Sequence, residues 1–416
     1  MGLRGIRALT VRICHVERSR NISKPFFKET GKQYKKEKIM AGIYIHVPFC
    51  RHKCSYCDFV SFPDKIDYAE AYMACLYKEL KMRGEELKDY EFDTVYFGGG
   101  TPSYIPPKLI LGAMKRIREC FRLTKNAEIT LELNPGTIGE NKIKTYKEAG
   151  INRFSIGLQT AIDSQLEDLG RIHNVHDYLY ATKLLKGENF STDIMLGLKN
   201  QTKEDIRKTV ELAHACGSKH ISMYALTVED GTPIYTDYLN GELPDSDEVA
   251  DMYAYGMRLL QEKGYERYEV SNFAVPGYES RHNLNYWKRG EYIGFGVAAS
   301  SFMRGKRFTN TFNLDEYMKC IISGHYPAVT SEEVGKEIAK FEFLMLGLRT
   351  KYGVSAKEYE KQFGSTIGED FPIAVKKSLQ YLESDGDRLK IKDEYLYVQN
   401  SILMPFMEEI PEEGKE

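Results

Sequence analysis

Long apolar runs are missing from this 416-residue sequence. No segment is apolar enough to cross a bilayer, and none resembles the apolar stretch of a secretory signal peptide, so we expect a cytoplasmic protein. Tryptophan is scarce, with a single copy, and the net charge is only −2. At this length we expect one large domain with one or more smaller ones.

The small net charge conceals an uneven distribution. Residues 1–39 carry eleven Lys or Arg and three Glu, a net charge of +8, so the remaining residues carry −10. An acidic body argues against a nucleic-acid partner. Because residues 1–39 show no apolar periodicity, we expect a disordered leader or a misassigned start there, with a basic arm that touches a membrane or a partner as the alternative.

Cysteine occurs eight times, but five copies are scattered singly, as small buried hydrophobic residues usually are. Only Cys50, Cys54 and Cys57 lie close together. In a reducing compartment such a cluster indicates metal or redox chemistry. Three thiolates satisfy three corners of a four-iron cubane and leave one iron open, whereas a structural zinc needs four ligands. The spacing favours a [4Fe-4S] cluster, with zinc and unligated thiols as the alternatives.

Strand-like and helix-like segments alternate after residue 40. The apolar strand-like runs are 42–49, 93–99, 128–134, 153–159, 191–198 and 220–226. The helix-like stretches are 67–87, 107–122, 139–149, 163–170, 175–186 and 203–216. Thr202 is a candidate N-cap of the last helix, and Gly217 is its stop. This alternation predicts an α/β fold with a parallel sheet, a partial (β/α)6 barrel, and a doubly wound sheet is the alternative.

The composition changes twice after this core, which we place at residues 40–235. Residues 236–330 are rich in Tyr, Asn and Gly, and we expect an irregular extension. Residues 331–416 predict an α+β, winged-helix-like module. Its predicted helices lie at 337–354, 355–364 and 371–386, followed by a hairpin at 388–399. Because no candidate recognition helix is strongly basic, we interpret this module as a packing or lid element rather than a DNA-binding one.

The cysteine motif and the glycine run "FGGGTPS" at 97–103 together resemble the radical S-adenosylmethionine (SAM) superfamily. In that superfamily the cluster passes one electron to SAM, which breaks to give a deoxyadenosyl radical. Further motifs are similar to those of the HemN/HemW family within it, most of all to its haem-chaperone branch. They are "LELNPGT" (131–137), "RFSIGLQT" (153–160), "LGRIH" (169–173), "DIMLGLKNQT" (193–202) and "YALTVEDGTP" (224–233).

This resemblance implies a set of residues that contact SAM. The matching positions are Tyr44, Gly99, Gly100, Thr101, Glu132, Gln159, Arg171 and Asp193. Their chemistry suits the role, because carboxylates accept hydrogen bonds from ribose hydroxyls or an amine and a guanidinium pairs with the SAM carboxylate. The alternative is that these polar strand ends are solvated or make structural hydrogen bonds.

The segment "HNLNYW" at 282–287 resembles the haem-binding motif of the chaperone branch. The resemblance implies that His282 is an axial ligand of haem iron, with Tyr286 and Trp287 against the porphyrin face. The alternative is a structural, hydrogen-bonded histidine. In the coproporphyrinogen dehydrogenase branch a fourth cysteine extends the cluster motif, and here Asp58 and Phe59 follow Cys57 instead.

Three hypotheses of function follow from these observations. The first is a haem chaperone that binds haem, the cluster and SAM and passes haem to acceptor proteins, among them membrane-associated respiratory proteins, with a homodimer as one possible assembly. The second is an oxygen-independent coproporphyrinogen III oxidase, which abstracts hydrogen with the adenosyl radical. The third is an interaction scaffold with a structural metal. The missing fourth cysteine and the HNxxYW motif favour the first.

Overall fold

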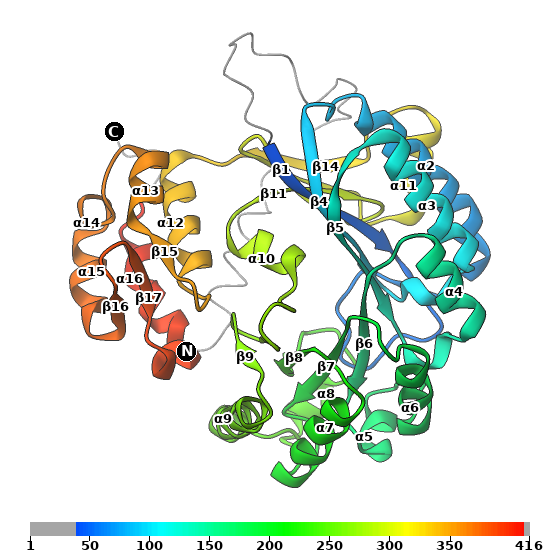
Figure 1. The fold of residues 1–416 in the computed structure, drawn as a ribbon, viewed down its shortest axis with the longest axis horizontal. Coiled ribbons are helices and arrows are strands. Elements are labelled where there is room, and N and C mark those ends of the chain that lie inside the picture. Colours follow the sequence, from blue (N-terminus) through cyan, green and yellow to red (C-terminus); the bar gives the residue numbers. More distant parts are fainter. Residues whose placement is uncertain (1–38, 412–416) are drawn as a thin grey trace.

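The computed structural model describes residues 39–411, which form one long sheet with helices outside it and a smaller module beside it (Figure 1). Within that range the long sheet has twelve strands, in the order β14-β13-β12-β11-β1-β4-β5-β6-β7-β8-β10-β9. The leader expected at residues 1–39 lies outside the described residues, except for Ile39, where β1 begins.

The centre of the sheet consists of six parallel strands, which confirms the predicted α/β alternation. These strands are β1 (Ile39–Val47), β4 (Tyr90–Gly99), β5 (Arg122–Leu133), β6 (Arg153–Gln159), β7 (Phe190–Leu196) and β8 (His220–Ala225). The helices between them are α2 (Ala69–Gly84), α3 (Pro107–Cys120), α4 (Glu140–Glu148), α5 (Asp163–Asp168), α6 (Val175–Leu184) and α7 (Lys203–Ala215). These helices lie along the outer side of a curved, open sheet (Figure 1), so the fold is a partial barrel and the doubly wound alternative is wrong.

Local sequence signals account for these elements. All seven residues of β6 are buried, as expected of a strand covered on both faces. Thr202 caps α7 in a capping box with Asp205, and Gly217 follows the helix with φ of +87°, a conformation that glycine adopts without strain. Both predicted ends of this helix are therefore confirmed.

The segment expected to be irregular at 236–330 is largely regular, and that expectation was wrong. Its elements are α8 (Tyr235–Leu239), α9 (Ser246–Glu262), β9 (Glu266–Arg267), β10 (Asn272–Ala274), α10 (Arg281–Trp287), β11 (Glu291–Phe295), β12 (Ser300–Met303), β13 (Lys306–Asn310) and α11 (Leu314–Ile322). The strands have two to five residues, too few for periodicity to emerge among so many Tyr and Gly. Most importantly, β11 pairs in parallel with β1 and continues the sheet beyond the barrel strands.

A second hydrophobic core lies in the C-terminal module, beyond the edge strand β14 (Ala328–Glu333). Its elements are α12 (Lys336–Gly347), β15 (Val354–Ser355), α13 (Ala356–Phe363), α14 (Ile367–Asp370), α15 (Pro372–Ser378), β16 (Leu382–Ser384), β17 (Arg388–Ile391) and α16 (Gln399–Glu408). The predicted hairpin at 388–399 is misplaced by one strand. β16 pairs with β17 across a turn at Asp385 and Gly386, and residues 393–398 form a 3₁₀ helix.

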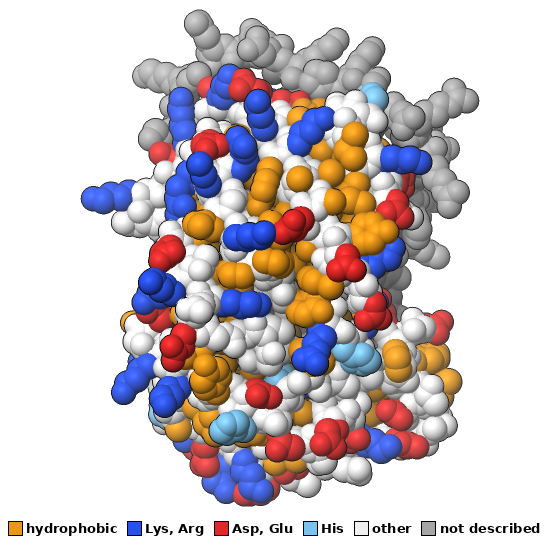
Figure 2. Space-filling view, turned by 90° about the vertical axis from the view of Figure 1, so that its right-hand side faces the viewer, with side chains coloured by type: hydrophobic (Ala, Val, Ile, Leu, Met, Phe, Trp, Pro, Cys, Tyr) orange, Lys and Arg blue, Asp and Glu red, His pale blue; other side chains and the backbone are white. Residues whose placement is uncertain are grey.

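The surface of the helical layer carries both signs of charge. Figure 2 shows Lys and Arg side chains interspersed with Asp and Glu around a band of hydrophobic side chains on this face. Among residues 39–411, no helix combines the length and the apolar character that spanning a bilayer requires.

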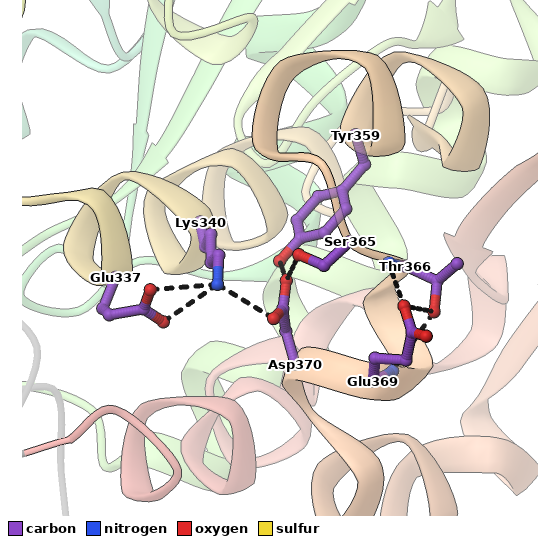
Figure 3. Close-up of polar contacts among 7 residues, drawn as sticks. All are labelled: Glu337, Lys340, Tyr359, Ser365, Thr366, Glu369 and Asp370. Carbon is purple, nitrogen blue, oxygen red and sulfur yellow. Dashed lines mark hydrogen bonds and ion pairs between the residues drawn. The ribbon is translucent and has the colours of Figure 1, made fainter.

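One carboxylate joins three segments of the C-terminal module (Figure 3). Asp370 accepts hydrogen bonds from Lys340 Nζ at 2.8 Å, Tyr359 Oη at 2.7 Å and Ser365 Oγ at 2.6 Å. Burial alone would raise the pKa of Asp370, but these hydrogen bonds outweigh it and hold the pKa below its usual value. Glu337 also pairs with Lys340, at 2.9 Å. The Lys340 side chain is only 7% exposed, so its charge depends on these two partners.

We predict that Asp370→Asn destabilises the protein by about 1.5–3 kcal/mol at neutral pH, because a charge-assisted hydrogen bond is lost from a largely buried ammonium group. Denaturant unfolding followed by circular dichroism measures the change. The folded-state pKa of this carboxyl is lowered, so its contribution is present above the unfolded pKa and is lost as the pH falls through the folded pKa. The variant and the unaltered protein should therefore converge in acid.

The matched control is Glu369→Gln, on the neighbouring residue of the same helix. Thr366 caps the exposed start of this helix, and the Glu369 carboxylate accepts a hydrogen bond from the Thr366 N–H. Glu369 has no contact with Lys340 (Figure 3). We expect a loss of about 1 kcal/mol or less. Equal losses in the two variants would contradict the role assigned to Asp370.

Candidate functional site

The cysteine cluster lies at the carboxyl end of β1. Cys50 ends the short strand β2 (Phe49–Cys50), and Cys54 and Cys57 lie on the loop that follows it. Cys50 is buried, while Cys54 and Cys57 are half-buried. The loop is fastened to two neighbours by Ser55, whose N–H donates to the Leu169 carbonyl at 3.0 Å and whose carbonyl accepts from the Ile234 N–H at 3.1 Å. All three thiols therefore occupy the mouth of the partial barrel, where the strand ends converge.

The glycine run after β4 packs directly against this loop. A Cβ at Gly100 would lie 3.0 Å from the Cys50 Sγ and 3.0 Å from the backbone of Phe49. Gly99 has φ of +115°, and a Cβ there would lie 2.7 Å from the His46 ring. The family resemblance implies that Gly99 and Gly100 contact SAM. The structure shows that they also let His46 and the cysteine loop approach, so the first contact they permit is within the protein.

Four of the predicted SAM-contacting residues lie on three neighbouring strands and on the segment between α5 and α6. Glu132 and Asp193 are in β5 and β7, Gln159 ends β6 with φ of +71°, and Arg171 follows α5. The Arg171 Nη1 lies 3.6 Å from the Cys54 Sγ, and its Nη2 donates to the Gly157 carbonyl at 3.1 Å. A Cβ at Gly157 would lie 2.8 Å from the Gln159 amide nitrogen and 3.0 Å from Arg171 Nη2. The fold thus brings this set together beside the cysteine loop.

Burial controls the ionisation of this interior. It raises the pKa of Glu132 to about 7, with a further rise from the charge of Asp193 and an opposing hydrogen bond from Tyr96 Oη at 2.8 Å. It raises the pKa of Asp193 to about 6, opposed by hydrogen bonds and by the charges of nearby arginines. Burial and the charge of Glu132 also raise the pKa of Tyr44. The carboxyl groups of Glu132 and Asp193 can therefore take up or share a proton near neutral pH.

The donor set at the loop consists of three thiols, from Cys50, Cys54 and Cys57. A tetrahedral zinc, with Zn–S bonds of about 2.3 Å, would need converging sulfurs and a fourth ligand. A cubane instead presents separate iron corners to separate thiolates. The tight fit of Gly100 on Cys50 and the nearby Arg171 cation suit an anionic, sulfur-ligated group.

His282 lies in α10, on the inner side of β1 and β4, and is 1% exposed. Its Nδ1 lies 2.7 Å from the Thr94 Oγ1, and its Nε2 lies 2.8 Å from the Tyr286 Oη. Its ring stacks on Tyr96 at 5.0 Å, and burial lowers its pKa to about 3. Both ring nitrogens are thus engaged within the protein, and His282 contacts other parts of the protein rather than open space. Direct ligation of haem by His282 stays a prediction.

A pocket of about 580 Å³ lies between the barrel mouth and the C-terminal module, and we call it the intermodule pocket. Its residues from the sheet side include Tyr44, Phe59, Tyr286, Tyr292 and Phe302. Its residues from the C-terminal module include Phe341, Met345, Arg349, Leu403, Met404 and Met407. Sequence reasoning named only Tyr44 and Tyr286 of these as part of any site. The others had no local signal, because a pattern of apolar residues on α12 and α16 predicts core packing equally well.

Comparisons with known proteins agree with this geometry. Residues 44–213 match the "Radical SAM superfamily", and residues 336–398 match the "HemN C-terminal domain". The "Heme chaperone HemW" of Bacillus subtilis is 33% identical over 81% of this chain and 90% of its own length. The protein of the same name from Escherichia coli is 34% identical over 88% and 98%. This chain belongs to the HemW family of radical SAM proteins.

The chain is also similar to a mitochondrial protein and to one solved structure over most of its length. The mitochondrial "Radical S-adenosyl methionine domain-containing protein 1" of Bos taurus is 32% identical over 89% of this chain and 88% of its own length. The structure of coproporphyrinogen III oxidase, HemN, from Escherichia coli superposes with a TM-score of 0.79 over 89% of this chain and 90% of that one. At 19% identity the latter shows a shared fold, which includes the C-terminal module.

We predict that Gly100→Ala lowers stability by about 1–3 kcal/mol and reduces the iron retained after anaerobic reconstitution, because the added methyl group displaces the Cys50 segment. Iron per chain and denaturant unfolding measure the two effects. Gly368→Ala is the matched control, since a Cβ there meets nothing within 4 Å and alanine favours the helix. Identical behaviour of the two variants would contradict the close approach at Gly100.

Proposed function

We propose that this chain is a haem chaperone that binds a [4Fe-4S] cluster, SAM and haem, and passes haem to acceptor proteins. The observation that carries the proposal is the intermodule pocket, an apolar space beside the cysteine loop with a buried, incompletely paired guanidinium in its wall. Family membership supports the proposal, since its relatives carry the name of haem chaperones.

The cluster and SAM have a ready set of partners at the barrel mouth. Cys50, Cys54 and Cys57 would hold three irons, and a bound cluster supplies one-electron chemistry to SAM. Arg171 would pair with the SAM carboxylate, because its guanidinium already faces the cysteine loop. Glu132 would accept hydrogen bonds from the ribose or the amine. Gly99 at the end of β4, Thr101 just after it and Asp193 within β7 are the further contacts that we propose for SAM.

The intermodule pocket suits a flat, mostly apolar molecule. Its volume of about 580 Å³ lies within the roughly 300–1,000 Å³ typical of pockets that enclose cofactor-sized ligands. Rings of Phe59, Tyr292 and Phe302 offer aromatic faces on the sheet side. Met345 and Met407 line the opposite wall, and flexible thioether side chains adapt to a ligand that must enter and leave. These features favour a haem carrier over a permanent haem site.

Arg349 places a positive charge in the wall of the pocket. Its Nη2 donates to the Asn400 Oδ1 at 2.9 Å, but its buried Nε has no hydrogen-bond partner among residues 39–411. Burial lowers the pKa of Arg349 to about 10, and no carboxylate contributes to the shift. A buried guanidinium in this state gains from a carboxylate ligand. Haem carries two propionates, so one of them would pair with Arg349.

The second candidate function is coproporphyrinogen oxidation, because the fold matches HemN and the same pocket would accept another tetrapyrrole. The residues after Cys57 favour the chaperone, since Asp58 and Phe59 stand where the dehydrogenase motif continues with cysteine. Incubation with coproporphyrinogen III, SAM and a reductant tests this directly. Formation of protoporphyrinogen would make the oxidase the better assignment.

We predict that Cys54→Ala loses most of the bound iron and SAM cleavage together, because two thiolates cannot hold a cubane. Anaerobic reconstitution, iron analysis and deoxyadenosine formation measure both. Cys216→Ala, at the end of α7 and away from the loop, should retain the iron of the unaltered protein. Retention of iron in both variants would overturn the ligand assignment.

We predict that Arg349→Gln weakens haem binding by about tenfold to a hundredfold, the loss expected for a charge-assisted hydrogen bond to a propionate. Titration of the anaerobic protein with haem, followed by the Soret band, measures the affinity. Arg116→Gln, on the outer face of α3, is the matched loss of charge and should leave the affinity unchanged. If the unaltered protein and both variants bound haem with equal affinity, Arg349 would not be part of the haem site.

A further inference from the structure

The intermodule pocket has a charged group at one end of α16 and apolar side chains along the rest of that helix. Arg349, which follows α12, donates from its Nη2 to the Asn400 Oδ1 at 2.9 Å, near the start of α16. From that contact α16 continues with Leu403, Met404 and Met407, which all line the pocket. Because an α-helix rises about 1.5 Å per residue, Met407 lies roughly 10 Å along the axis from Asn400. The charged end and the apolar wall are therefore different parts of one pocket.

Arg349 differs from the other arginines that line the pocket, because those have carboxylate partners. Arg289 Nε pairs with Glu342 at 2.8 Å. Arg307 pairs with Glu342 at 2.6 Å and with Glu332 at 2.8 Å. Within the part of the chain that the structure describes, no carboxylate pairs with Arg349. The pocket thus offers an uncompensated positive charge at the Arg349 end.

Away from Arg349, the wall disfavours additional carboxylates. Phe341 and Met345 extend the apolar surface along α12, and the Asp58 carboxylate lies on the sheet side. A ligand carboxylate that is buried against apolar side chains loses its hydration, and one that lies near another carboxylate is repelled. The pocket is therefore matched to a molecule whose negative charges all lie on one edge.

We propose that the intermodule pocket selects a tetrapyrrole whose carboxylates lie on one edge only, with Arg349 as the anchor and the apolar stretch of α16 as the selecting wall. This inference rests on the proposed haem-binding function and deepens it by naming the class of ligand. Rings of the protoporphyrin type, haem included, carry two propionates side by side and methyl and vinyl groups elsewhere. Coproporphyrin III carries four propionates, two of them in place of the vinyl groups. The size of the pocket admits either ring, and charge separates them.

The Arg349 side chain has enough donors for the two propionates of one edge. A guanidinium carries five N–H groups, and the hydrogen bond to Asn400 uses one of them. The Nε–H is buried without a hydrogen-bond partner among residues 39–411, so a carboxylate at this end would satisfy it.

This selection acts on the edges of the ring and does not require a metal at its centre. His46 lines the pocket, but its Nδ1 lies 3.0 Å from the Tyr44 Oη and its Nε2 lies 2.9 Å from the Val60 carbonyl oxygen. Both ring nitrogens are therefore engaged within the protein. A metal-free dicarboxylic porphyrin presents the same edges as haem, so we expect it to bind in the same pocket.

The test compares three metal-free porphyrins on the full-length protein by fluorescence titration. Protoporphyrin IX and mesoporphyrin IX each carry two propionates, and mesoporphyrin has ethyl in place of vinyl, so this pair controls for the vinyl groups. Coproporphyrin III is the tetracarboxylic ligand. We expect the first two to bind with affinities within about threefold of each other, and coproporphyrin III to bind at least about tenfold more weakly.

Met404→Lys tests the selecting wall by a gain of binding. The Met404 side chain is 37% exposed, so a lysine is tolerated there and its ammonium group can pair with the second carboxylate edge of coproporphyrin III. We expect binding of coproporphyrin III to tighten at least about tenfold, and binding of protoporphyrin IX to stay within about threefold. Met404→Gln, which is polar but uncharged, is the matched control and should keep the selectivity of the unaltered protein. Circular dichroism verifies that both variants fold.

Equal affinities of the unaltered protein for protoporphyrin IX and coproporphyrin III would overturn the selection. A gain in coproporphyrin affinity that is as large in Met404→Gln as in Met404→Lys, or is missing from both, would overturn the role of the α16 wall. Binding of haem without binding of any metal-free porphyrin would also overturn this inference, while the haem chaperone would stand. If neither haem nor any porphyrin bound, the proposed function itself would be refuted.

Discussion

The intermodule pocket depends on one carboxylate that binds two arginines. Glu342 in α12 accepts from Arg289 Nε at 2.8 Å and from Arg307 Nη2 at 2.6 Å, and its side chain is only 8% exposed. These partners come from the end of α10 and from β13, so the carboxylate fastens the C-terminal module to the extended sheet. Loss of one member of such a buried group costs about 3–5 kcal/mol, because a charge is left without its partner. The contact joins the pocket's two walls, and Lys351 adds ion pairs with Glu266 and Glu279 between the module and the rest of the chain.

A short column of aromatic rings runs from the barrel interior to the wall of the pocket. Tyr96 donates to Glu132 at 2.8 Å on one side and stacks on His282 on the other, and His282 in turn contacts Tyr286. Glu132, which is predicted to contact SAM, is therefore linked to the pocket wall by two rings in direct contact. β11 makes this possible, because its parallel pairing with β1 seats α10 against the barrel.

The sequence predicts features that residues close together in the chain determine, such as strands, helices and the cysteine loop. It does not predict features that distant segments assemble, such as the pocket wall. The six strands and helices follow from apolar periodicity and caps such as Thr202, and the cysteine loop follows from spacing alone. The predicted hairpin is misplaced because the turn that contains Gly386, at φ of +99°, comes before residues 388–391 and pairs them with β16. Arg349 carries no local signal at all. Its significance comes from a buried Nε that has no hydrogen-bond partner within the described range 39–411, and the wall around it is assembled from residues between Tyr44 and Ile410.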